Sequence, residues 1–143
     1  MNESGHPDDV RTPLVLALLH AAQALEHRLE DAFADVGLST ARYGVLAQLD
    51  RAGEPIPLGT LAERLSCVRS NITQLVDRLE ADGLVRRIAD PSDRRCVLAE
   101  LTPAGRERAM AGAARLREVQ ATFDGSLSTD DRATLERIVA ALA

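Results

Sequence analysis

The sequence contains no lysine and no tryptophan, and its aromatic residues are limited to Phe33, Tyr43 and Phe123. All 17 basic residues are therefore Arg, which a GC-rich coding bias explains without any functional cause. With only 2% aromatic residues, a hydrophobic core must be built from Leu, Val, Ile and Ala. Because Ala and Leu are the strongest helix formers, this composition favours a helix-rich fold.

The sequence also lacks a long apolar run. No stretch approaches the roughly 20 apolar residues that a membrane-spanning helix needs. The first nine residues are polar and acidic, which is typical of a loosely held tail and not of a secretory signal. The cytoplasm is therefore the expected location.

Cysteine and histidine are too sparse for a disulfide framework or a metal site. Cys67 and Cys96 form no C-x-x-C pair, and His20 and His27 stand about 10.5 Å apart along a helix axis. One metal ion cannot bind both histidines directly, because Zn–N bonds are about 2 Å long. Neither a metal nor another cofactor is expected.

Motifs that carry catalysis are missing as well. The chain has no G-x-S-x-G elbow, no P-loop, no glycine-rich dinucleotide turn and no H-E-x-x-H helix. Its Ser, His and Asp residues show no spacing that suggests a catalytic triad. The sequence therefore predicts a protein that is not an enzyme.

The most informative stretch runs from residue 58 to residue 102. Apolar residues at helical spacing predict one short helix over 58–65 and a second over 68–81, joined by a tight corner at 66–68. Gly83 ends the second helix, and strand-like segments follow at 84–88 and 97–101. A helix, a turn, a helix and a two-stranded wing, in this order, are the parts of a winged helix-turn-helix.

Two groups of polar residues in this stretch suit contact with DNA. The outward face of the second helix carries short hydrogen-bonding side chains and Arg, which can contact base edges in a major groove. The loop 89–95 presents Arg94 and Arg95, and Arg on a narrow loop can enter a minor groove. Asp93 is expected to hold one Arg side chain in place.

The net charge of −5 hides a locally basic segment, since residues 64–95 contain seven Arg and five acidic residues.

Helices are also expected on both sides of this stretch. Apolar stripes predict a long helix over about 10–36 and a second over 40–51 with Ser39 as its cap. Thr102 and Pro103 start another long helix with a seam of small and apolar residues, and Ser128 caps a last one. The predicted fold is mainly α (α+β), with dimerisation regions at 1–36 and 103–143 around a DNA-binding domain at 37–102.

Taken together, these features resemble the MarR family of bacterial transcriptional regulators. The family's wing signature D-x-R-x5-L-T is matched by Asp93, Arg95, Leu101 and Thr102. Val68 stands where family members often have a Ser or Asp cap. The resemblance implies a homodimer in which each chain places the helix predicted over 68–81, its recognition helix, in the major groove of double-stranded DNA. The DNA-contacting residues are then expected to be Arg69, Ser70, Asn71, Thr73, Gln74, Arg78, Arg94 and Arg95.

The resemblance also implies a mode of regulation. Family members typically repress transcription from a pseudo-palindromic operator and release it when a small aromatic or phenolic ligand binds. Candidate residues for such a pocket are His20, Gln23, His27 and Tyr43.

Two alternatives to this function stay open. A thiol-oxidation-responsive regulator would use Cys67, expected to be buried, or Cys96, where the adjacent Arg95 favours the reactive thiolate. A protein-interaction module that does not bind DNA would show binding that is insensitive to salt, whereas phosphate-driven binding weakens steeply as salt rises.

Overall fold

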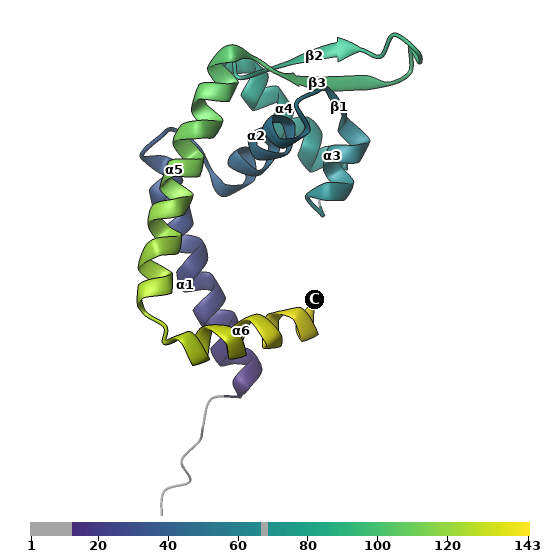
Figure 1. Ribbon diagram of the computed structural model, residues 1–143. Coiled ribbons are helices and arrows are strands. Elements are labelled where there is room, and N and C mark those ends of the chain that lie inside the picture. The colour runs from purple at the N-terminus through teal and green to yellow at the C-terminus, as the bar shows by residue number, and fades with distance from the viewer. Residues whose placement is uncertain (1–12, 67–68) are drawn as a thin grey trace, which may run out of the picture.

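The structure, a computed structural model, describes residues 13–66 and 69–143. In chain order, the elements are α1 (Leu14–Ala34), α2 (Thr40–Ala52), β1 (Ile56–Pro57), α3 (Leu58–Arg64), α4 (Arg69–Ala81), β2 (Val85–Ala89), β3 (Val97–Leu101), α5 (Pro103–Gly125) and α6 (Thr129–Leu142). The described residues of the range 37–102 form a winged helical unit, and α1, α5 and α6 form a helical arm that extends away from it (Figure 1).

The predicted helix starts and stops are confirmed where the sequence carried a local signal. Ser39, Thr102 and Ser128 each accept a hydrogen bond from a backbone N–H of the first helical turn that follows. Gly83, the predicted stop of α4, follows that helix at a φ of 74°, and Gly37 lies in the turn after α1 at a φ of 70°, a region that favours glycine. The start predicted for α1 at residue 10 and the corner at Cys67 lie outside the described residues.

The hydrophobic core lies between α2, α3, α4 and the sheet. Its side chains come from the apolar faces of the helices. On α2, Val45 is fully buried, whereas Tyr43 and Ala47 are only half-buried. The buried apolar residues are Phe33, Leu38, Val45, Leu46, Leu49, Ile56, Leu58, Leu61, Ala62, Ile72, Val76, Leu79, Leu84, Val85, Ala99 and Ala109.

The sheet has a third strand that the sequence analysis missed. β2 and β3 pair as the expected antiparallel hairpin, and β1 pairs antiparallel with the other side of β3. The segment around Pro55 and Pro57 carries no strand-like alternation in the sequence. Pro57 is compatible with β1 because an edge strand leaves room for a residue without an N–H.

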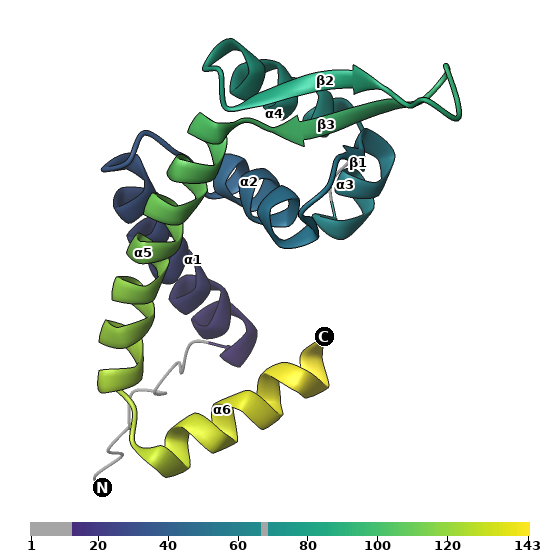
Figure 2. The same cartoon turned by 45° about the horizontal axis from the view of Figure 1, so that its top comes forward.

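The arm consists of α5 running beside α1, with α6 turning away from its far end (Figures 1 and 2). The small residues of α5 allow close packing within the chain itself. A Cβ at Gly112 would lie 2.5 Å from Tyr43 Cδ2 on α2, and a Cβ at Gly105 would lie 1.9 Å from the Leu84 carbonyl oxygen. Of the predicted seam, Ala109 is buried in the core and Leu116 packs against it, so this part of the seam serves the chain itself.

The far end of the arm exposes its apolar side chains. Leu14 and Val15 on α1 are 84% and 69% exposed, and Val139 and Leu142 on α6 are 56% and 67% exposed. Within the described residues, no helix is both long and apolar enough to cross a membrane.

Candidate nucleic-acid interface

Helix α4 separates its apolar and polar side chains onto opposite faces. Ile72, Val76 and Leu79 are fully buried and fix the helix against the core. The opposite face is open to solvent along the helix. It carries the predicted DNA-contacting residues Ser70, Asn71, Thr73, Gln74 and Arg78, whereas the side chain of Arg69 lies outside the described residues.

Three of these residues share one surface depression. Asn71, Gln74 and Arg78 stand at successive turns of α4, because residues three or four apart lie on one helix face. With Ala41 and Leu75 they line a shallow hollow of about 270 Å³ between α4 and α2. An amide pair and a guanidinium in one row offer the donors and acceptors that base edges match.

Arg87 on β2 ties the wing to the exposed side of α4. Its guanidinium lies 2.6 Å from Asp77 Oδ1 and 3.1 Å from Glu80 Oε1, and it also donates to the Thr73 carbonyl. The Arg87 backbone N–H donates to Glu80 Oε2 as well, at 2.8 Å. These bonds hold α4 in a fixed position relative to the hairpin. Sequence analysis counted Arg87 only among the seven Arg residues of the segment 64–95 and missed this structural role.

Thr102 joins the base of the wing to the end of α4. Its hydroxyl donates to the Gly83 carbonyl at 2.7 Å and accepts from the Gly105 N–H at 3.0 Å. Its backbone N–H donates to the Leu84 carbonyl. The last residue of the predicted wing signature therefore has a structural explanation, since it fixes the α4–β2 turn, β3 and α5 together.

The wing loop is braced by its own carboxylates. Asp90 accepts from both the backbone N–H and the hydroxyl of Ser92, which lowers the pKa of the Asp90 carboxyl below its usual range. Asp93 Oδ1 accepts from the backbone N–H of Arg95 at 3.0 Å. This bond goes to the main chain of Arg95, and the expected bond of Asp93 to an Arg side chain stays a prediction.

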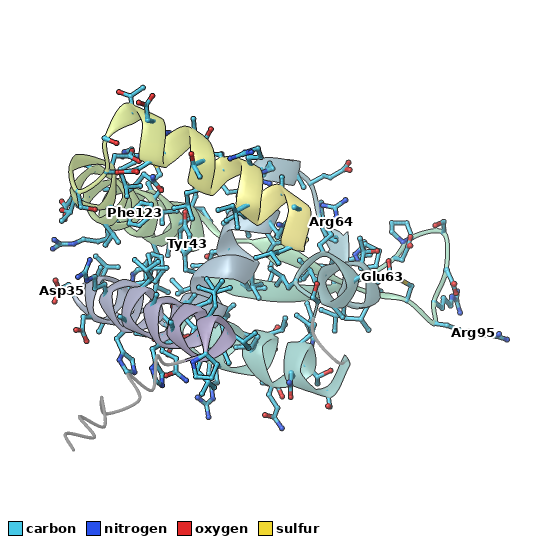
Figure 3. The ribbon with its side chains drawn as sticks, turned by 90° about the horizontal axis from the view of Figure 1, so that it is seen from below. Asp35, Tyr43, Glu63, Arg64, Arg95 and Phe123 are labelled. Carbon is cyan, nitrogen blue, oxygen red and sulfur yellow. The ribbon has the colours of Figure 1, made fainter. Side chains whose placement is uncertain are left out.

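The loop carries Arg94 and Arg95 exposed at its end, with Arg95 pointing away from the body of the molecule (Figure 3). Within the described ranges, neither forms an ion pair, and the same holds for Arg78 on α4. Two other Arg residues of this segment are neutralised, since Arg86 pairs with Glu100 and Arg87 with two acids. Among the described side chains of this segment, the Arg residues without an ion pair are therefore Arg64 on α3, Arg78 on α4, and Arg94 and Arg95 at the wing tip.

The four predicted pocket residues do not come together. Only His27 lines a cavity of about 550 Å³ between α1, α2 and α4. Tyr43 instead stacks on Phe33 with ring centroids 4.5 Å apart, and His20 and Gln23 are exposed on α1 away from the cavity lining. A helical stripe shows which residues share a face but not which neighbour covers that face.

The two cysteines differ in what can be said of them. Cys67 lies outside the described residues, while Cys96 is half-buried with a free thiol. The main chain of Cys96 closes the wing loop, since its carbonyl accepts from the Asp90 N–H and its N–H donates to the Asp93 carbonyl. Cys96 therefore stands at the neck of the loop that carries Arg95.

Comparison with known proteins places this geometry in a family. The MarR family profile matches residues 38–97. The transcriptional repressor YetL of Bacillus subtilis is 33% identical over 96 residues, which cover 66% of this chain and 58% of that protein. The crystal structure of a probable transcriptional regulator from Pseudomonas aeruginosa is 30% identical, with a TM-score of 0.81 over 92% of this chain and 97% of the other.

The fold likeness extends to a protein solved with DNA. A mutant MarR from E. coli in complex with operator DNA has a TM-score of 0.82 at 24% identity, covering 96% of this chain and 99% of that one. The fold is that of a winged helix-turn-helix regulator, and the chain belongs to the MarR family. Members of this family are transcriptional regulators and not enzymes. The chain spans about half the length of the curated relatives that it matches.

Proposed function

We propose that this protein is a sequence-specific DNA-binding repressor that acts as a homodimer on a pseudo-palindromic operator. The observation that carries the proposal is the exposed row of Asn71, Gln74 and Arg78 on a helix whose opposite face is fully buried. Such a row can contact base edges while the core holds the helix rigid. The unpaired Arg95 at the wing tip supplies a contact to the minor groove.

The homodimer is supported by the apolar end of the arm. Exposed Leu and Val side chains on α1 and α6 form a surface that water disfavours, and a second copy of the same surface would cover it. A two-fold dimer presents two α4 helices, so the operator should have half-sites about one helical turn, or roughly 34 Å, apart.

Selection of random duplex DNA by the purified protein, followed by fluorescence anisotropy of the enriched sequence, tests this proposal. We expect a palindrome whose affinity falls steeply with salt, because each phosphate contact releases counterions. Enrichment of no sequence, or binding that ignores salt, would favour an interaction module that does not bind DNA.

Matched variants separate the two kinds of contact. Arg95→Ala should weaken binding to all sequences. It should also reduce the slope of log affinity against log salt concentration by about one, the share of one phosphate contact. Gln74→Ala should relax preference at particular operator positions, costing about 1–3 kcal/mol against the preferred base. Arg117→Ala removes the same charge as Arg95→Ala from an exposed position on α5, and it should leave operator affinity unchanged. Equal affinity of Arg95→Ala and the wild type would exclude the wing from the interface.

Release from the operator by a small aromatic or phenolic ligand is the second part of the proposal. The cavity that His27 lines is of the size that small ligands occupy, and it lies between the arm helix α1 and the helices of the winged unit. A ligand there could change the position of α4 relative to the arm. Loss of operator binding in the presence of such a compound, measured by anisotropy, tests this part.

Thiol oxidation is an alternative means of release. It is favoured by the position of Cys96, whose main chain closes the wing loop. Oxidation of its half-buried thiol would add polar bulk at the neck of the loop. Peroxide should then release the wild-type protein from DNA but not the Cys96→Ser variant, and equal release of both proteins would rule Cys96 out.

A further inference from the structure

The cavity between α1, α2 and α4 has an asymmetric lining. Its apolar side is formed by short and branched side chains, and its polar side comes from α1 and the start of α2. The lining residues are Glu26, His27, Glu30, Thr40, Ala41, Gly44, Leu65 and Leu75. At about 550 Å³, the cavity falls in the range of sites that bind small molecules.

The charge of this lining is negative. Glu26 and Glu30 contribute two carboxylates, and no Arg belongs to the described lining. Glu30 is held at the wall because its Oε1 accepts from the Thr40 backbone N–H at 2.9 Å. The Thr40 hydroxyl oxygen is buried and has no hydrogen-bond partner among the described residues.

The cavity also shares a wall with the candidate DNA interface. Ala41 and Leu75 line both this cavity and the shallow hollow that Asn71, Gln74 and Arg78 form on the exposed side of α4. A molecule that presses on Leu75 therefore acts on α4 itself, one residue from Gln74. No long chain of contacts is needed to connect the two sites.

We propose that this cavity binds a compact aromatic amine in its protonated form and discriminates against aromatic carboxylates. The inference rests on the proposed function, because it names the chemical class of the releasing ligand. The aromatic ring lies against Leu65 and Leu75, and the ammonium group lies between Glu26 and Glu30. A carboxylate in the same place would face two like charges, and no Arg belongs to the described lining.

Three ring compounds of similar size test the charge preference without DNA. Benzylamine, benzyl alcohol and benzoate are titrated at neutral pH into the full chain, and binding is followed by the shifts of backbone amide NMR signals. We expect benzylamine to bind roughly fivefold to tenfold more tightly than benzoate, as a partly exposed charge pair allows. The largest shifts are expected at Thr40, Gly44 and Leu75.

Variants then locate the preference. Glu26→Gln combined with Glu30→Gln keeps an oxygen that can accept from the Thr40 N–H but removes both charges, so benzylamine and benzoate should bind equally. Glu63→Gln combined with Glu107→Gln removes the same charge from exposed positions elsewhere and should keep the wild-type preference. Ala41→Met keeps both carboxylates and fills the cavity, so it should weaken benzylamine binding.

The outcomes also separate this inference from the proposed function. Tighter binding of benzoate, an unchanged preference in the double Glu→Gln variant, or shifts centred elsewhere would overturn the inference. Operator binding is measured on the same samples. Benzylamine selectivity without operator binding keeps the inference and rejects the regulator, whereas operator binding without selectivity rejects the inference alone.

Discussion

The winged unit (residues 37–102) and the far end of the arm treat their apolar side chains in opposite ways. All the buried apolar side chains except Phe33 and Ala109 lie in the winged unit, and Leu61 and Leu79 are completely inaccessible. At the far end, Leu14 is 84% exposed and Leu142 is 67% exposed. The winged unit therefore buries its own core within one chain, whereas the far end presents a surface that only another molecule can cover.

The largest loss of stability should come from removing a side chain from the buried core of the winged unit. Leu79→Ala removes a fully buried side chain from α4, and such substitutions cost about 2–5 kcal/mol. Chemical denaturation should show this loss in the free energy of unfolding. Leu142→Ala removes the same atoms from an exposed position and should change the unfolding of the winged unit very little. Similar losses in both variants would mean that the two regions do not differ as described.

The next largest effect concerns dimer dissociation and tests the exposed apolar end of the arm. Ile138→Glu places a charge on α6 at a site that is 47% exposed in one chain. In an isologous dimer the change appears twice, so dissociation should become easier by about 2–3 kcal/mol, or roughly 100-fold. Analytical ultracentrifugation measures this, with circular dichroism to verify the fold. Met110→Glu on the exposed side of α5 is the control, and a dimer unaffected by Ile138→Glu would place the interface elsewhere.

A smaller effect tests the joint between the two regions. Gly105→Ala places a Cβ 1.9 Å from the Leu84 carbonyl oxygen, so the start of α5 must move away from the wing base. Overpacking of this kind costs about 1–3 kcal/mol. Gly125→Ala, where an added Cβ meets nothing within 4 Å, should cost much less. Thermal denaturation of the two variants compares them, and equal stabilities would show that the contact is not tight in solution.

The smallest effect concerns acid and the wing loop. The pKa of Asp90 is lowered because the Ser92 backbone N–H and hydroxyl donate to its carboxylate. This stabilisation is fully present above the usual aspartate pKa of about 3.9 and is lost as the pH falls through the lowered value. Exchange of the Ser92 amide hydrogen should therefore gain protection as the pH rises through this window. Asp90→Asn keeps an acceptor oxygen and should lose this pH dependence.

Local signals in the sequence were enough to predict most of the fold. A cap such as Ser128 acts within one helical turn, and the stripe of Ile72, Val76 and Leu79 reports directly which side of α4 is buried. β1 was not predictable in this way, because two residues that include Pro57 carry no alternation and pair only through β3. Its existence depends on tertiary contacts.

In the candidate site too, features with a local sequence signal were predicted, whereas features that depend on tertiary contacts were missed. The exposed polar residues of α4 and the exposed Arg94 and Arg95 lie where the sequence placed them, and their contacts with DNA stay a prediction. The Arg87 bonds to Asp77 and Glu80 join two elements and left no periodic signal. The pocket residues were the least predictable, because a cavity forms between helices whose relative placement no single stripe encodes.

The joint at Gly105 has a geometric consequence for how two copies could meet a duplex. α5 is a single helix of 23 residues, so it is about 34 Å long, and its first turn is fixed to the wing base through Thr102. Because α5 is one continuous helix, a rotation at its far end moves its first turn and the attached wing base together. A swing of about 10° at the far end moves the wing base by about 6 Å over that length. This displacement exceeds the roughly 3.4 Å rise between successive base pairs. Small changes in how the two arms cross would thus shift each recognition helix by more than one base-pair step.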